Sequence, residues 1–185
     1  HDLRVDPDNR DNCTNGTIFW TKDNNRMKIL SGEKLTLPTL QCEYLLAHQD
    51  LGSVVTVKNL NTDNFTLILR YDGHEVRYEM ENNTVFIDGK FKNSTRYLTR
   101  LTPGFFVERA GGYFSIQAPG IRWGCSTRVQ WNRFSLVSKK DCGKGLVYDS
   151  DINSRDTGEE LLSMLKPYLV DSSCSPTKKE IRKWF

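Results

Sequence analysis

Five Asn-x-Thr triplets are the clearest chemical signal in this 185-residue chain. Such a triplet without proline at its middle position can accept an N-linked glycan, and a used site must lie on the surface because the glycan is bulky and solvated. Glycans are added in the secretory pathway, so the triplets predict a secreted glycoprotein. The five candidate acceptors are Asn12, Asn15, Asn64, Asn82 and Asn93.

Five cysteines accompany these triplets, and an oxidising location favours disulfides among them. Because five is an odd number, at least one cysteine is free, bonded to another chain or bonded to a ligand. No CxxC pair or Cys/His cluster has the spacing of a zinc site. Cys125 lies near Trp123 and Trp131 in the sequence. Three roles stay open for it: a buried inert thiol, a link to another chain, or the attachment point of a ligand.

An acidic segment near the C-terminal end could hold calcium. Asp149, Asp151 and Asn153 alternate along the chain, and Glu160 is the twelfth residue counted from Asp149. Calcium takes several oxygen ligands, so carboxylates and amides at this spacing suit it. Ser154 stands where an EF-hand needs glycine, and Glu160 also suits a helix cap. A calcium-holding loop and a plain polar loop therefore both remain open.

Catalytic motifs are absent from the sequence. The three histidines are His1, His48 and His74, and none belongs to a Cys/His protease signature. The chain has no GxSxG, no glycine-rich phosphate or dinucleotide motif and no HExxH. We therefore predict that the chain is not an enzyme; a secreted hydrolase without a known motif is the remaining alternative.

Composition argues against two further classes of function. The chain has 26 basic and 23 acidic residues, for a net charge of +3, so its overall charge gives no reason to expect a nucleic-acid partner. No apolar stretch is long enough to predict a membrane span.

The length of the chain suits one domain with a real hydrophobic core. Because the chain begins with His1 rather than methionine, we expect a processed product or a fragment of a longer parent.

The elements that must position these residues are predicted to be mainly β-strands. Runs rich in Val, Ile, Leu and Thr are separated by short turns at regular intervals. Asp72-Gly73, Asp88-Gly89 and Gly111-Gly112 predict tight turns between strands. The imperfect alternation over 129–137 predicts a bulge there. The predicted strands are Ser53–Leu60, Phe65–Tyr71, His74–Met80, Val85–Ile87, Phe105–Glu108, Tyr113–Gln117, Ile121–Trp123 and Val129–Val137.

One helix is predicted after the strands. Thr157 and Glu160 fit a capping box, with Thr157 as the N-cap. Leu161 and Leu165 are four residues apart, which places them on one helical face, and Pro167 limits the helix. The predicted fold is therefore mainly β: an antiparallel β-sheet domain with one C-terminal helix packed on it.

The order of these parts resembles that of von Willebrand factor type D domains. The stretch Leu37–Asp50 contains Cys-Glu-Tyr-Leu-Leu-Ala-His-Gln-Asp, similar to the family's Cys-x-Tyr-x-Leu-Ala-x-Asp. Asp141–Gly143 stands near the family's Gly-Leu-Cys-Gly, and an acidic loop, a helix and a last cysteine, Cys174, follow it. The other matching parts are Cys13, the turn at 21–25 in place of the family's Thr-Phe-Asp-Gly, and Phe114–Trp123.

The resemblance implies a fold and the boundaries of the domain that adopts it. It implies a type D, sandwich-like domain over 13–174, between a flexible N-terminal tail at 1–12 and a basic C-terminal tail at 175–185. The family's calcium loop follows its Gly-Leu-Cys-Gly motif, and the acidic segment that begins at Asp149 occupies that place here.

The resemblance also implies a pairing of the cysteines. Carried over residue by residue, it implies the disulfides Cys13–Cys142 and Cys42–Cys174. Cys125 is then left without a partner inside the domain.

Sparse cysteines make the chain most similar to the D domain at the C-terminal end of vitellogenins and related large lipid-transfer proteins. That resemblance implies a non-catalytic module of a secreted lipid transport or storage glycoprotein of haemolymph or egg yolk. We expect it to assemble with sibling chains of its parent, and an apolar ligand or lipid to be a further partner. Because the family often transports pigments, one alternative is a carrier of a carotenoid or of a bilin attached to Cys125. Another is a lipocalin-type barrel for a small apolar ligand.

Overall fold

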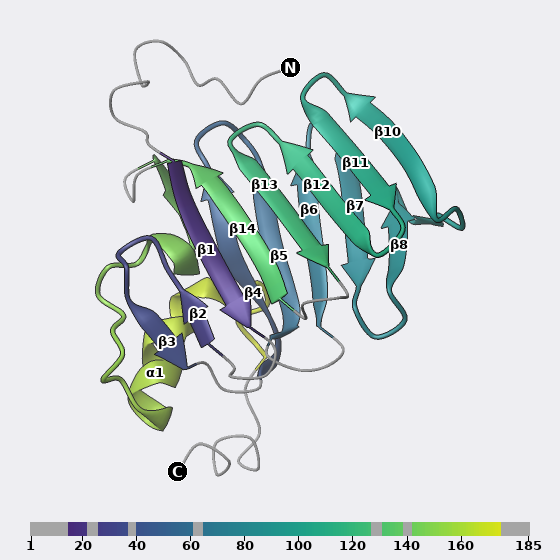
Figure 1. Ribbon diagram of the computed structural model, residues 1–185. Helices are drawn as coiled ribbons and strands as arrows, with labels where there is room; N and C mark the ends of the chain where they lie inside the picture. Colours follow the sequence, from purple (N-terminus) through teal and green to yellow (C-terminus); the bar gives the residue numbers. More distant parts are fainter. Residues whose placement is uncertain are drawn as a thin grey trace.

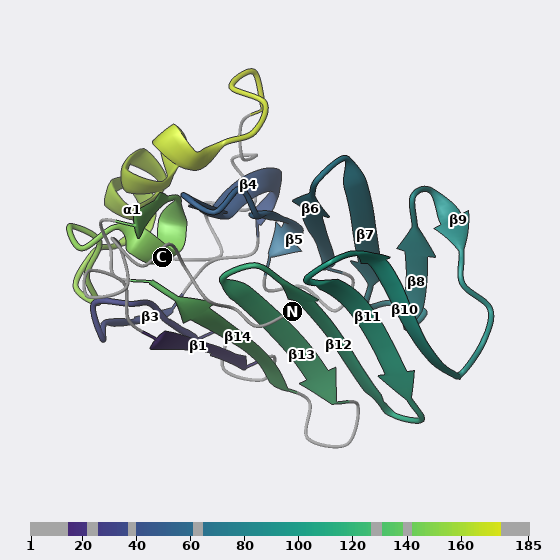
Figure 2. The same cartoon turned by 90° about the horizontal axis from the view of Figure 1, so that it is seen from above.

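Two antiparallel β-sheets, packed face to face, form the body of the domain (Figures 1 and 2). The computed structural model describes residues 15–21, 26–36, 40–60, 65–126, 131–138 and 142–174. The tails predicted at the two ends of the chain lie outside these residues. Antiparallel strands with a short helix near the C-terminal end confirm the predicted fold class.

The first sheet, in front in Figure 1, contains eight strands. It places the first strand of the described residues beside a strand more than a hundred residues later, as the pairing of Asn15 with Val137 shows. Across the sheet the strands are β10 (Arg96–Thr102), β11 (Phe105–Ala110), β12 (Tyr113–Ala118), β13 (Ile121–Ser126), β14 (Trp131–Val137), β1 (Asn15–Thr21), β2 (Arg26–Lys28) and β3 (Lys34–Thr36).

The second sheet lies behind the first and contains seven strands. Apart from its first strand, it follows the order of the sequence, as short turns between successive antiparallel strands favour. Across the sheet the strands are β15 (Gly143–Lys144), β4 (Leu40–Gln49), β5 (Val54–Leu60), β6 (Thr66–Tyr71), β7 (His74–Glu79), β8 (Thr84–Ile87) and β9 (Lys90–Phe91).

Tight turns form where the Asp-Gly pairs predict them. Asp72 and Gly73 join β6 to β7 with φ angles of 51° and 78°, and Asp88 and Gly89 join β8 to β9 with 51° and 81°. Two successive left-handed residues give a turn whose twist matches that of the flanking strands, and Asp and Gly tolerate this conformation. The predicted hairpins are therefore confirmed.

Large side chains fill the space between the sheets. The ring of Tyr78 on β7 lies 5.0 Å from that of Phe114 on β12 and 5.1 Å from that of Trp123 on β13, measured between centroids. The rings of Phe114 and Trp123 meet edge to face at 5.7 Å. All three side chains are at most 2% exposed. Because both sheets contribute to this cluster, ring packing holds the two layers together.

The helix lies at one end of the sandwich, beside β4 (Figure 2). α1 (Gly158–Leu165) is followed at once by the 3-10 turn η3 (Lys166–Tyr168), which contains Pro167. Leu161 and Leu165 are buried, as their spacing predicts. A second 3-10 turn, η2 (Leu146–Tyr148), packs beside β4.

The structure corrects two details of the sequence prediction. β14 pairs in regular register with both neighbours, so the bulge predicted over 129–137 is wrong for the described part of that range. Register shifts occur instead between β4 and β5, and between Arg100 and Thr102 of β10. Thr157 is the N-cap of α1, but its side chain makes no capping hydrogen bond.

Neither sheet closes on itself among the described strands. β10 and β3 end the first sheet, and β15 and β9 end the second. A lipocalin is a single closed up-and-down barrel that encloses its ligand. The lipocalin-type alternative therefore does not fit this architecture.

Candidate functional site

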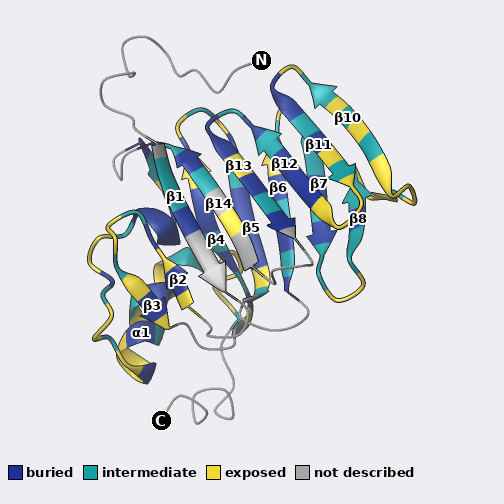
Figure 3. Cartoon of the chain, in the orientation of Figure 1, coloured by how far each residue is buried: buried dark blue, intermediate teal, exposed yellow. Residues whose placement is uncertain are grey.

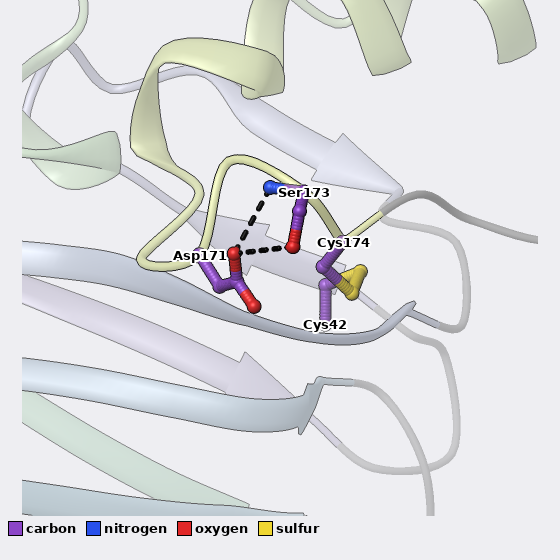
Figure 4. Close-up of a disulfide and its surroundings, with 4 residues drawn as sticks. All are labelled: Cys42, Asp171, Ser173 and Cys174. Atoms are coloured by element: carbon purple, nitrogen blue, oxygen red, sulfur yellow. Dashed lines mark hydrogen bonds between the residues drawn. A yellow bond between two sulfur atoms is a disulfide. The ribbon is translucent and has the colours of Figure 1, made fainter.

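A disulfide joins the C-terminal segment to β4 (Figure 4). Cys42 and Cys174 are 132 residues apart in the sequence, and their Cα atoms are 6.0 Å apart. This confirms the second pairing that the D-domain resemblance implies. Cys142 is also disulfide-bonded, and Cys13, the partner implied for it, lies outside the described residues.

Hydrogen bonds shape the segment that carries Cys174. The amide of Val170 donates to the carbonyl of Glu43 on β4 at 3.0 Å. One carboxylate oxygen of Asp171 accepts from the hydroxyl of Ser173 at 2.7 Å and from its amide at 3.0 Å (Figure 4). These two bonds lower the pKa of Asp171. The segment thus reaches the disulfide in a defined conformation.

Cys125 lies on the inner face of β13, where it is 6% exposed. Its thiol donates to the hydroxyl of Tyr78 at 3.4 Å, and that hydroxyl donates to the side-chain oxygen of Asn83 at 2.9 Å. Burial raises the pKa of the Cys125 thiol, and burial followed by the neighbouring Cys125 raises the pKa of Tyr78. A shielded, protonated thiol is a weak nucleophile.

A ligand-attachment site would need Cys125 to be accessible. Trp123, two residues earlier on the same inner face, is fully buried. Trp131 pairs with Ser126 between β13 and β14, and its side chain lies outside the described part of the structure. The geometry therefore favours the buried, inert role of Cys125 over attachment to a bilin or to another chain.

We expect Cys125 to resist a thiol reagent until the protein unfolds. At pH 8, the native protein should react with dithionitrobenzoate at least about a hundredfold more slowly than the protein in guanidinium, because the sulfur is buried. Reaction at equal rates would contradict this burial. The reagent's absorbance gives both rates.

The same pKa shift predicts the direction of a pH effect. The thiol has a higher pKa in the folded protein than its ordinary value of 9.0, so the unfolded chain loses the proton first as the pH rises. The contribution to stability is complete below pH 9 and is lost above it. The midpoint of urea unfolding should therefore fall above pH 9, and Cys125→Ala should make that fall shallower.

The acidic loop borders an open hollow of about 560 Å³. One carboxylate oxygen of Asp149 accepts the amide N–H of Asp151 at 2.8 Å, and the other accepts the hydroxyl of Tyr168. The side-chain oxygen of Asn153 accepts the amide N–H of Arg155 at 2.8 Å. Two of the three candidate calcium ligands therefore use their oxygens to shape the loop itself.

The donor set of this loop does not fit a calcium ion well. Calcium needs six to eight oxygen ligands, and side-chain oxygens of Asp149 and Asn153 already accept hydrogen bonds within the protein. Burial, followed by the hydrogen bond to Asp149, raises the pKa of Tyr168, so the phenol stays protonated and holds Asp149. Ile152 is fully buried and fixes the middle of the loop. This geometry fits a plain polar loop better.

Two candidate glycan acceptors lie on the described surface. Asn82 is exposed in the turn between β7 and β8, and Asn93 is exposed between β9 and β10. Asn15 is the first residue of β1, and its side chain is outside the described part. Asn12 and Asn64 lie outside the described residues altogether.

The two histidines of the described residues lie on different strands, His48 on β4 and His74 on β7. His48 is exposed on β4. His74 lies 2.8 Å from a carboxylate oxygen of Asp88, while the amide of Glu75 donates to the other oxygen at 2.9 Å. The backbone bond from Glu75 and then His74 lower the pKa of Asp88. Sequence reasoning missed this pair. The available signal was that one Asp-Gly turn precedes β7 and the other follows β8, so antiparallel pairing of these two strands places both turns at the same end.

No family model matches this chain, and no curated protein matches it at the significance required. Of the helices in the described residues, none combines the length and apolar character that crossing a membrane requires.

Proposed function

We propose that this chain is a non-catalytic D-type module of a secreted, vitellogenin-like lipid transport or storage glycoprotein, and that it assembles with sibling chains. The observation that carries the proposal is the Cys42–Cys174 disulfide, which the D-domain resemblance implies. A disulfide also supports an extracellular location, because cytosolic thiols are kept reduced.

The surface supports the same proposal. Asn82 and Asn93 are exposed, as glycan acceptors must be. Phe91 and Leu98 are 55% and 67% exposed on β9 and β10, which are edge strands of the two different sheets. Exposed apolar side chains at sheet edges suit contact with another chain, because edge strands also present unpaired backbone groups.

Glycosylation can be tested one triplet at a time. When the chain is expressed with a secretion signal, we expect Thr84→Ala and Thr95→Ala each to remove one glycan, because the hydroxyl residue of the triplet is required. Thr84→Ser and Thr95→Ser are matched controls that keep the triplet. Mobility before and after enzymatic deglycosylation measures the result. Unchanged mobility of both alanine variants would count against the secretory location.

Assembly can be tested on the native protein. Isolated from its natural fluid without reductant, the chain should elute with other chains of its parent. Size-exclusion chromatography with light scattering, followed by mass spectrometry of the peak, would identify them. A monomer of 21.3 kDa plus glycans at every concentration would refute the assembly.

A further inference from the structure

The outer face of the eight-stranded sheet, which faces the viewer in Figure 3, carries many exposed basic side chains. Strand alternation turns every second side chain to this face. Along β10 to β14 the exposed charged side chains there are Arg96, Arg100, Arg122, Arg133 and a single acid, Glu108. By the pairing register, the same face continues on β2 and β3 with the exposed side chains of Arg26, Lys28 and Lys34.

The outer face of the seven-stranded sheet balances its charges. Arg70 donates to the carboxylate of Glu75 at 3.0 Å, and Arg77 lies 3.5 Å from that of Glu79. The net charge of the whole chain is only +3. The positive charge is therefore concentrated on one of the two sheet faces, and such a concentration attracts an anionic partner.

A hollow of about 460 Å³ lies in the basic face. Its lining residues are Tyr113, Arg122, Gly124, Arg133 and Ser135. Across β13 and β14, Arg122 pairs with Ser135 and Gly124 pairs with Arg133. A Cβ atom on Gly124 would be 3.3 Å from the hydroxyl of Tyr113. The Tyr113 hydroxyl therefore lies close above Gly124, where the lack of a side chain leaves space.

The hollow offers the donors that a sulfate group needs. The guanidinium groups of Arg122 and Arg133 are planar forks that can bind two oxygens of one anion. The hydroxyls of Tyr113 and Ser135 can donate to the remaining oxygens.

We propose that the outer face of the eight-stranded sheet binds a sulfated polysaccharide, and that the hollow over Gly124 holds one of its sulfate groups. Basic side chains repeat across strands spaced about 4.8 Å apart, which matches an extended chain of anions better than a single anion. Among the described side chains of this face, the large exposed apolar ones are Leu98 and Tyr113. Two such side chains bury little apolar area in a lipid bilayer, so a membrane surface fits less well. The inference goes beyond the assembly proposed above and is tested independently of it.

The first experiment uses the whole chain on immobilised heparin, a sulfated polysaccharide. We expect the wild-type chain to bind and to elute with salt, and the Arg122→Gln/Arg133→Gln variant to bind at least about tenfold more weakly, because charge-assisted hydrogen bonds are lost. Lys58→Gln/Arg70→Gln is the matched control: it removes the same charge from the other sheet and should bind as the wild type does. Equal weakening in both variants would overturn a face-specific site, as would failure of the wild type to bind.

The second experiment separates the hollow from the charge around it. Gly124→Val keeps every arginine but fills the floor of the hollow, so we expect it to weaken heparin binding about tenfold with unchanged net charge. Wild-type affinity in this variant would overturn the role of the hollow.

Heparin stripped of its sulfates should not compete with immobilised heparin for the chain. Binding to phosphatidylserine vesicles without binding to heparin would overturn the polysaccharide in favour of a membrane. Circular dichroism confirms that each variant is folded.

Discussion

Replacing both Cys42 and Cys174 with alanine is expected to lower the free energy of unfolding by about 5 kcal/mol. The bond closes a loop spanning 132 residues of sequence. In the chain-entropy account a disulfide restricts the unfolded chain, and the restriction grows with the length of the loop. Urea unfolding at 25 °C, followed by tryptophan fluorescence, measures the difference in stability.

The control for this prediction is Cys125→Ala, which removes a buried sulfur without opening a disulfide. We expect this variant to lose no more than about 2 kcal/mol, because it only deletes a small side chain. Reductant is a poorer test, since it also opens the disulfide of Cys142. A loss below about 1 kcal/mol in the double variant would contradict a stabilising role for the Cys42–Cys174 bond.

Trp123→Ala is expected to lower the free energy of unfolding by about 3–5 kcal/mol. The indole is fully buried and contacts the rings of Tyr78 and Phe114, so the substitution leaves a cavity between the two sheets. Tyr78 in one sheet and Phe114 in the other both lose their ring contact with the indole. Thermal unfolding followed by calorimetry measures the loss.

Trp123→Phe is the matched variant. The indole N–H has no hydrogen-bond acceptor among the described residues, so phenylalanine removes an unsatisfied donor together with some volume. We expect a loss of about 1–2 kcal/mol, well below that of alanine. Equal losses in both variants would show that the site responds to loss of the indole itself rather than to the cavity.

Local features of the fold were predictable because they depend on neighbouring residues. The Asp72-Gly73 and Asp88-Gly89 turns need residues that tolerate positive φ, and the sequence shows them directly. The helix after Thr157 follows from the spacing of its leucines and from Pro167. Seven of the described strands were not predicted one by one: β1, β2, β3, β4, β9, β10 and β15. Of the longer ones, β4 was considered only as part of a motif, and β10 mixes arginine with apolar residues at an edge of its sheet.

The candidate sites were predictable only in part. The spacing of Asp149, Asp151 and Asn153 suggests a metal loop, but the hydroxyl of Tyr168 and local amides occupy side-chain oxygens of Asp149 and Asn153. No pattern along the chain indicates which residue will approach Asp149 from a later turn. The nearness of Cys125 to tryptophans suggested attachment, whereas strand alternation places it in the core.

By itself, the sequence determined the strand-rich class, the Asp-Gly turns, the late helix and the candidate glycan acceptors, since each depends on residue types within a few positions. The tertiary structure alone decided that β1 lies beside β14, that Cys125 is buried, and that arginines from separate strands share one outer face. These outcomes depend on contacts between distant segments. Their free energies are summed over the whole core, so no local stretch of sequence specifies them.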